Sequence, residues 1–314
     1  MSARDFATDP AGYFGMSWHA MQHVDRDELA ELQLAAARLR FAELRDQIPT
    51  LAALAGEQGI TELRELDDLV PLLFQHSVYK SYPASLLVGN QFGPLTKWLD
   101  RLTTHDLSGL DVADCDSIDA WLDRLDAETP LRVAHSSGTT GTMSFYPRGA
   151  GEWDAMMRAL RCGLFQFSDP ENTVDHEGEW FELVWPLFRQ GRAAITRFPD
   201  VALPHIMGSE DRIHALRPGR LSSDGMFLAG RLAAADARGE TDALELGPAL
   251  AGRRDQFVRE QQEMQQGLPH FVTSLSRELE GRRVWLLGTF NTLYGMARAA
   301  LDAGLEGVFA PDSL

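Results

Sequence analysis

The fold is decided by the stretch Leu131-Arg132-Val133-Ala134-His135-Ser136-Ser137-Gly138-Thr139-Thr140-Gly141 and by the apolar segment 143–147 that follows it. The apolar residues at 131–134 and 143–147 predict two short neighbouring strands. The small and hydroxyl-bearing residues between them predict a loop. Strands and helices then alternate through the rest of the sequence, which predicts an α/β fold, a mixed layered sheet flanked by helices.

The loop has the composition of a phosphate-binding loop. Glycine allows backbone conformations that other residues avoid and lets a ligand approach closely. Successive backbone N–H groups in such a turn form an anion-binding nest, and serine and threonine hydroxyls add further donors. A polar hairpin turn without a ligand is the alternative. The predicted nucleotide-phosphate-binding residues are Ser136, Ser137, Gly138, Thr139, Thr140 and Gly141.

This loop resembles the phosphate loop of the acyl-adenylate-forming enzymes, the AMP-binding superfamily. The match is Ser137-Gly138-Thr139-Thr140-Gly141, with Ser136 before it. In that family the loop lies between two strands and holds the phosphates of ATP. The family pattern continues with Pro-Lys-Gly, whereas this chain has Met143-Ser144-Phe145 and lacks the loop lysine. The divergent branch of the phenylacetate–CoA ligases and the acyl-protein synthetases departs at the same place, so the chain looks like one of that branch.

A second resemblance begins at the strand predicted for 180–185. In the superfamily, a Pro-Leu-Phe-His-x-x-Gly-like turn follows this strand and lines the acyl pocket. The segment 185–191 is similar, with arginine where histidine is usual. A strand followed by an ordinary Pro/Gly turn is the alternative. The resemblance implies a substrate pocket at Trp185, Pro186, Phe188 and Arg189.

The resemblance implies an ATP-dependent ligase of the acyl-CoA or acyl-protein synthetase type. In such an enzyme a carboxylic acid attacks the α-phosphate of Mg-ATP, and a thiol, an amine or a protein then accepts the acyl group. ATP and Mg²⁺ are implied by the resemblance alone, and no catalytic residue is assigned. The main alternative is a non-catalytic binding or scaffold subunit that keeps the adenylate-forming core. A third reading makes Ser136 or Ser137 an acyl-accepting nucleophile, with His135 as the neighbouring base.

The resemblance covers 131–314 and, more faintly, 72–130. The family's later Tyr-Gly-x-Thr-Glu segment, which serves the α-phosphate and magnesium, has no counterpart in the 314 residues. The small C-terminal lid domain of the family also has no counterpart in these residues. We therefore expect the chain to supply the front part of an adenylate-forming site and to need further polypeptide for an enzymatic rate.

The bulk composition excludes several partners. A net charge of −17 argues against binding to nucleic acid or to an anionic membrane, since both need basic patches. The two cysteines, Cys115 and Cys162, form neither a disulfide framework nor a metal site by their spacing. No metal site is predicted at His19 and His23, because no third ligand is patterned with them. With no signal peptide and no apolar run of membrane-spanning length, the expected location is the cytoplasm.

The predicted organisation is a mostly helical N-terminal region at 1–130 and an α/β core at 131–314 that carries the phosphate loop. The segment 192–225, rich in proline, is predicted as loops. Helices are predicted at 25–46, 50–58, 62–70, 92–102, 117–125, 149–167, 225–237, 251–266, 268–280 and 290–303, and later strands at 180–185, 283–287 and 308–311.

Overall fold

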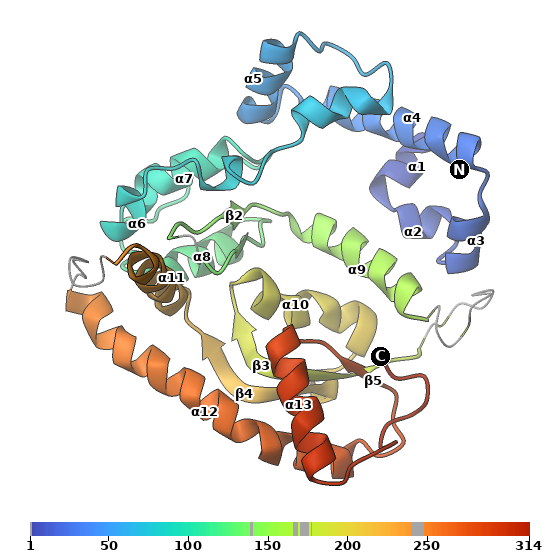
Figure 1. Cartoon of the computed structure of the whole chain (residues 1–314). Coiled ribbons are helices and arrows are strands. Elements are labelled where there is room, and N and C mark those ends of the chain that lie inside the picture. Colours follow the sequence, from blue (N-terminus) through green and yellow to red (C-terminus); the bar gives the residue numbers. More distant parts are fainter. Residues whose placement is uncertain (1, 139–140, 166–168, 170–175, 177, 240–247) are drawn as a thin grey trace. The chain divides into compact units, whose positions relative to one another are not determined.

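A computed structural model describes residues 2–138, 141–165, 169, 176, 178–239 and 248–314, and within 248–265 only the side chains of 259 and 262–264 (Figure 1). The chain divides into two compact units. Unit 1 comprises 1–134 and 144–175, and unit 2 comprises 135–143 and 176–314. The α/β fold class with a helical N-terminal region is confirmed. Residues 131–134 and 144–175, which the sequence places in the predicted α/β core at 131–314, cluster with the N-terminal residues instead.

Unit 1 is built almost entirely of helices. Asp25 caps the longest described helix of this unit, α4, by accepting from the backbone N–H groups of Asp27 and Glu28. The predicted helix at 62–70 forms instead as a 3₁₀ helix at 66–72. The elements are α1 (Ala3–Thr8), α2 (Pro10–Tyr13), α3 (Trp18–His23), α4 (Arg26–Leu44), α5 (Pro49–Gln58), η1 (Leu66–Leu72), η2 (Val78–Lys80), α6 (Ser85–Val88), α7 (Phe92–Asp100), α8 (Ile118–Glu128), β2 (Phe145–Tyr146) and α9 (Ala150–Phe165).

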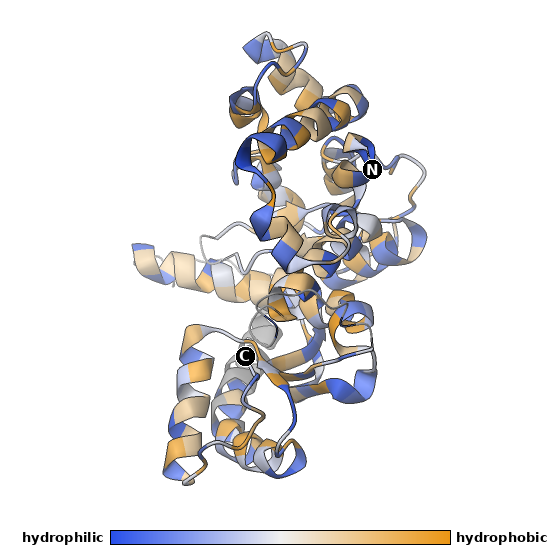
Figure 2. Ribbon diagram, turned by 90° about the vertical axis from the view of Figure 1, so that its right-hand side faces the viewer, coloured by the Kyte–Doolittle hydropathy of each residue, from blue (hydrophilic) through white to orange (hydrophobic). Residues whose placement is uncertain are grey.

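An aromatic group holds the middle of unit 1 together. The rings of Phe92 and Trp121 stack with centroids 5.8 Å apart, and Phe145 meets Trp121 edge-on at 5.2 Å. The indole Nε1 of Trp121 donates to the hydroxyl of Thr96 at 2.9 Å, so its polar group is satisfied although the residue is fully buried. The buried residues of α7 recur at helical spacing, and alternating hydrophobic and hydrophilic segments are visible along the helices in Figure 2.

Unit 2 is an α/β unit around a three-stranded parallel sheet of order β4-β3-β5. Strand β1 joins the two units in sequence and pairs with β2 in a separate two-stranded sheet. The elements, with β1 first, are β1 (Ala134–His135), β3 (Glu182–Gly191), α10 (Ala194–Ala202), η3 (Leu203–Met207), η4 (Glu210–Arg212), β4 (Ile213–Leu221), α11 (Ser223–Arg238), α12 (Pro248–Glu278), β5 (Val284–Leu286) and α13 (Phe290–Asp302).

Both faces of this sheet are covered. On one face Phe198 of α10 packs between Trp185 of β3, at 6.2 Å, and Trp285 of β5, at 5.3 Å between ring centroids. On the other face Val184 and Val284 join a cluster with side chains of α12 and α13. Neighbouring residues of a strand point to opposite faces, so these pairs define three layers, helix, sheet and helix (Figure 1).

The segment 192–225 is not loop-rich, and the prediction there was wrong. It contains α10, β4 and two short helical turns. Pro199 lies inside α10 and Pro218 inside β4, although proline usually interrupts helices and strands. Strand β4 is at an edge of the sheet, where a missing backbone N–H is tolerated.

Two further differences lie towards the C-terminal end. The helices predicted at 251–266 and 268–280 form one helix, α12, which continues through Pro269. Residues 308–311 form no strand, but Leu314 donates to Val284 O and accepts from Leu286 N along β5. In the described part of the chain, no helix has both the length and the apolar character that crossing a bilayer requires.

We expect Leu183→Ala to lower the free energy of unfolding by about 2–5 kcal/mol, because it removes a fully buried side chain from the central strand. The measurement is urea denaturation. The matched control is Leu301→Ala on α13, whose side chain is exposed and whose loss should change stability by less than about 0.5 kcal/mol. Equal losses in the two variants would contradict the proposed core.

Candidate functional site

The predicted phosphate loop begins at the carboxyl end of the central strand of unit 2. The backbone N–H of His135 donates to Arg192 O, one residue after β3 ends, at 3.2 Å. His135 also forms a parallel bridge with Ala193, which caps α10. In parallel sheets, ligands bind outside the carboxyl ends of the strands, where the following helices begin. The contacts of His135 with Arg192 and Ala193 therefore place the start of the loop at the sheet edge where ligands usually bind in such folds.

The described part of the loop makes a tight, glycine-dependent turn. Gly138 has φ of +68° and Gly141 has φ of +87°, values that side-chain-bearing residues rarely adopt. The N–H of Gly141 donates to Gly138 O at 2.7 Å and closes the turn. The region 136–141 is not helical where it is described, as predicted. Thr139 and Thr140 lie outside the described residues.

Helix α11 supports the loop along one face. His135 contacts Ser223, and a Cβ at position 230 would lie 2.3 Å from Gly138 O. A Cβ on Gly141 would be 3.2 Å from that of Ala234. Positions 223, 230 and 234 are seven and four residues apart, so they lie on one face of the helix. Small residues at these positions allow the loop backbone to lie directly against α11.

The ring of His135 fixes the loop to the first turn of α11. Its Nδ1 lies 2.8 Å from Ser136 O and its Nε2 lies 3.0 Å from the hydroxyl of Ser223. A carbonyl oxygen only accepts, so Nδ1 carries a proton, and in the neutral ring Nε2 accepts from Ser223. Both residues are buried. The ring nitrogens are thus engaged elsewhere, which disfavours His135 as a base for a nucleophilic Ser136 or Ser137.

Of the predicted phosphate-binding residues, Ser136 is half-buried, Ser137 is exposed and Gly138 is buried against α11. The structure brings Ser136, Gly138 and Gly141 into one turn beside α11. Asp224, which the sequence did not single out, is a buried carboxylate in the first turn of that helix. In the sequence, small residues recur at helical spacing within 223–234. This spacing indicates a contact face of α11 only when the position of the loop is already known.

Arginines are placed around this edge. Arg192 directly follows β3 and Arg220 is the penultimate residue of β4. Arg231 is next to Gly230 on α11, and its guanidinium lies 5.8 Å from the ring centroid of Phe227. Its Nη1 is buried without a hydrogen-bond partner among the described residues. Arg148 belongs to unit 1, and its guanidinium stacks on the ring of Trp153 at 5.2 Å.

The residues predicted to line an acyl pocket lie in β3 itself. The strand continues through Pro186 to Gly191, so the expected turn after 185 does not form. The register shifts around Pro186, as expected where a residue without an N–H interrupts a central strand. Trp185 is fully buried and donates from Nε1 to Phe188 O at 2.9 Å. Pro186 and Phe188 are buried as well. A role of these residues in a substrate pocket stays a prediction.

Arg189 is held by two carboxylates. Its Nε and Nη2 donate to the two oxygens of Glu210, each at 2.7 Å, and its Nη1 donates to Asp200 at 2.7 Å. Burial opposes its charge, but these hydrogen bonds leave the pKa of Arg189 above its ordinary value. The same hydrogen bonds hold the pKa of Glu210 below 4.5, its ordinary value. Through these three hydrogen bonds Arg189 connects β3 to Asp200 of α10 and to Glu210 of η4.

Within the described ranges, no three His, Cys, Asp or Glu side chains gather as a metal site. His19 and His23 stack with ring centroids 3.9 Å apart, and Nδ1 of His23 lies 2.9 Å from His19 O. A ring nitrogen next to a carbonyl oxygen is a donor, so this nitrogen is not available to a cation.

We expect Gly230→Ala to displace the loop from α11, because the added Cβ would meet backbone atoms of Gly138 that cannot move alone. The predicted cost is about 1–3 kcal/mol, with faster hydrogen exchange at 135–138. The control is Gly151→Ala in α9, where nothing lies within 4 Å of the new Cβ. Because Gly151 is exposed in the first turn of α9, that change should alter stability by less than about 0.5 kcal/mol. A Gly230→Ala protein as stable as Gly151→Ala, with unchanged exchange, would refute the close contact.

We expect Arg189→Met to lower stability near neutral pH by about 1 kcal/mol, a small value because Asp200 and Glu210 are more than a third exposed and screened by water. The pKa of Glu210 is lowered in the folded state, so the stability it contributes is present above pH 4.5 and is lost as the pH falls below it. The difference from the wild type in urea denaturation should therefore shrink with acidification. A difference that is independent of pH would contradict the ion pair.

Comparisons with known proteins leave the family open. The sequence matches no protein-family model, no curated protein and no solved structure. The function below is therefore argued from the loop and its surroundings in unit 2.

Proposed function

We propose that residues 136–141 bind the phosphates of ATP, and that the chain takes part in activating a carboxylic acid as an acyl-adenylate. The supporting observation is the loop itself, a glycine-dependent turn at the carboxyl edge of a parallel sheet, lying against a helix through a face of small residues. This is the setting in which backbone N–H groups bind phosphate.

The groups around the loop suit a polyphosphate. The hydroxyl of Ser137 is exposed in this turn and can donate to a phosphate oxygen. Arg231 directly follows Gly230 on α11, its Nη1 is buried without a partner among the described residues, and arginine binds phosphate oxygens in pairs. In this proposal Arg231 provides the charge that the missing loop lysine gives in the resembled family.

Magnesium accompanies ATP and takes one or two protein carboxylates together with phosphate oxygens. Asp224 is the carboxylate in the first turn of α11, beside Ser223, and is our candidate for that role. When bound, the ion would reduce the negative charge on the phosphates. The chain's own part is to hold the β- and γ-phosphates while a carboxylate oxygen bonds to the α-phosphorus and pyrophosphate leaves.

The acyl group would pass to a thiol, an amine or a protein, which acts as the acceptor partner. A further polypeptide that completes the site is part of the proposal. So is a cytoplasmic location, which suits a chain whose Cys115 and Cys162 are both buried thiols.

We expect Arg231→Met to weaken binding of Mg-ATP and of pyrophosphate about ten- to hundredfold, because a charge-assisted hydrogen bond is lost while the side-chain stem is kept. Calorimetry measures the affinity, and hydrogen exchange at 136–138 reports protection by the ligand. The control is Arg298→Met on α13, an exposed arginine in a surface pair with Asp302. Equal affinity in the two variants, or protection that survives Gly138→Val with Gly141→Val, would show that the loop is not the site.

A second assay separates an enzyme from a binding subunit. Carboxylate-dependent exchange of labelled pyrophosphate into ATP requires adenylate formation at the α-phosphate. Exchange that Gly138→Val abolishes would support the ligase. Phosphate binding with no exchange, by the chain alone or with candidate partner polypeptides, would support the non-catalytic alternative.

A further inference from the structure

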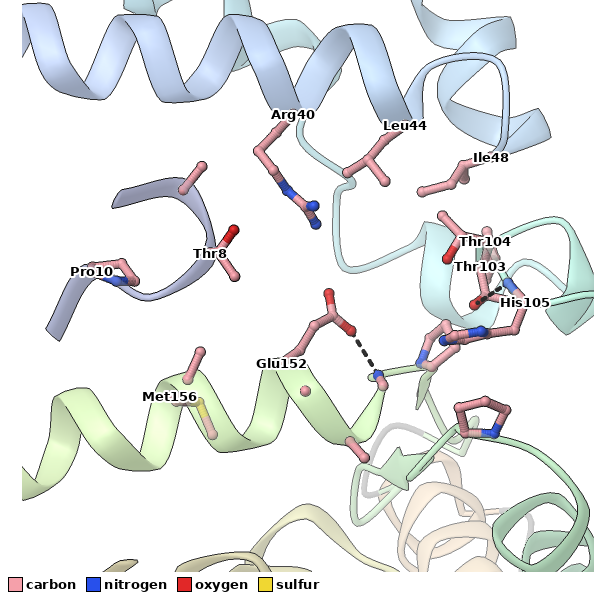
Figure 3. A pocket seen from close by; sticks show the side chains of 18 of the residues that line it. Thr8, Pro10, Arg40, Leu44, Ile48, Thr103, Thr104, His105, Glu152 and Met156 are labelled. Atoms are coloured by element: carbon pink, nitrogen blue, oxygen red, sulfur yellow. Dashed lines mark hydrogen bonds between the residues drawn. The ribbon is translucent and has the colours of Figure 1, made fainter. Parts of the chain in front are cut away.

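Unit 1 contains a cavity of about 720 Å³ that the phosphate loop does not use (Figure 3). Its walls come from the segment of α1 and α2, from α4, from α9 and from the residues around 102–105. The volume is typical of a small-molecule site, which encloses roughly 300–1,000 Å³. All of the lining residues belong to unit 1, so the cavity is complete within one compact unit.

Much of the cavity wall is apolar, and in Figure 3 Leu44 and Ile48 line it opposite α9. Small side chains on α9 leave the space open along that helix. The apolar lining residues include Leu44, Ile48, Leu102, Ala155, Met156 and Ala159. Such a surface favours an apolar body of the size of a side chain or a ring.

Arg40 enters the cavity from α4 (Figure 3). Its nearest carboxylate is Glu43, 3.7 Å away, which is beyond hydrogen-bond distance. The other oxygen of Glu43 is taken by Arg4 at 2.5 Å. Among the described residues, the guanidinium of Arg40 therefore has donors available to an anionic group.

Glu152 reaches into the same cavity from α9, and in Figure 3 its carboxylate and the guanidinium of Arg40 point toward one another from opposite walls. Its Oε2 accepts from the N–H of Gly149 at 2.7 Å, which fixes the side chain at the start of α9. Its Oε1 has no hydrogen-bond partner among the described residues. The cavity thus presents a held carboxylate opposite a cation.

We propose that this cavity binds a small zwitterion with an apolar body, an α-amino acid with an apolar side chain. The ligand's carboxylate pairs with Arg40, its ammonium group with Glu152, and its side chain packs on the wall of Leu44, Ile48 and Met156. A simple organic acid would set its carboxylate near Glu152, and a simple amine would set its charge near Arg40. Only a ligand that carries both a carboxylate and an ammonium group can pair with both Arg40 and Glu152. The site is independent of the proposed nucleotide loop.

The experiment is calorimetric titration of the full chain with three probes of the same apolar body. They are L-phenylalanine, 3-phenylpropionate, which lacks the amine, and 2-phenylethylamine, which lacks the carboxylate. We expect L-phenylalanine to bind with a dissociation constant of about 1 mM or below and each analogue to bind at least about tenfold more weakly. Equal binding of either analogue, or no heat with L-phenylalanine and L-leucine, would overturn the proposal.

Variants locate the binding. Arg40→Met and Glu152→Gln should each weaken binding of L-phenylalanine about ten- to hundredfold. Glutamine keeps the acceptor for Gly149, so the start of α9 should remain folded, which circular dichroism checks. The control is Arg26→Met, an exposed arginine on the same helix as Arg40, which should bind as the wild type does. Folded Arg40→Met and Glu152→Gln proteins with wild-type affinity would place the ligand elsewhere and refute the assignment.

Discussion

The contact between Gly138 and Gly230 sets the geometry on which the candidate site depends. The carbonyl oxygen of Gly138 lies so near α11 that one added carbon atom would be 2.3 Å from it. A loop backbone can lie this close to a helix only where the helix has no side chain. The hydrogen bond of His135 with Ser223 fixes the preceding part of the loop, so its direction along α11 is set at two points.

This arrangement follows from the layers of unit 2. Helix α10 covers the face with Trp185 and Trp285, and α12 and α13 cover the face with Val184 and Val284. The candidate loop lies at the end of a strand instead. The carboxyl ends of β3 and β4 are also where α10 and α11 begin. A loop that starts beside Ala193 is therefore near the positive ends of helices.

The distribution of charge in the chain also distinguishes the edge of the sheet where the loop lies. The chain has 46 acidic and 29 basic residues, yet Arg192, Arg220 and Arg231 lie at or near the loop edge. In an acidic protein such a grouping is a local departure from the overall field, and it favours an anionic ligand at this edge. Arg189 differs, because its donors are used by Glu210 and Asp200 and its effect is on the stability of β3 and its neighbours.

The sequence by itself determined the local features. The pattern of residues 25–46 predicted the helix α4, and two apolar segments around a run of small residues predicted a loop between β1 and β2. These signals are local because they depend on residues a few positions apart. The prediction of loops for 192–225 was wrong because proline destabilises an isolated helix or strand. Pro199 is tolerated inside the packed helix α10, and Pro218 inside the edge strand β4. Only the tertiary structure decided that Ser223, Gly230 and Ala234 face the loop. It also decided that Arg189 forms ion pairs between β3 and its neighbours. The shared cavity of Arg40 and Glu152 is likewise a result of the tertiary structure. Each of these depends on contacts between residues far apart in the chain, and the packing of whole helices and strands, rather than local propensity, brings them together.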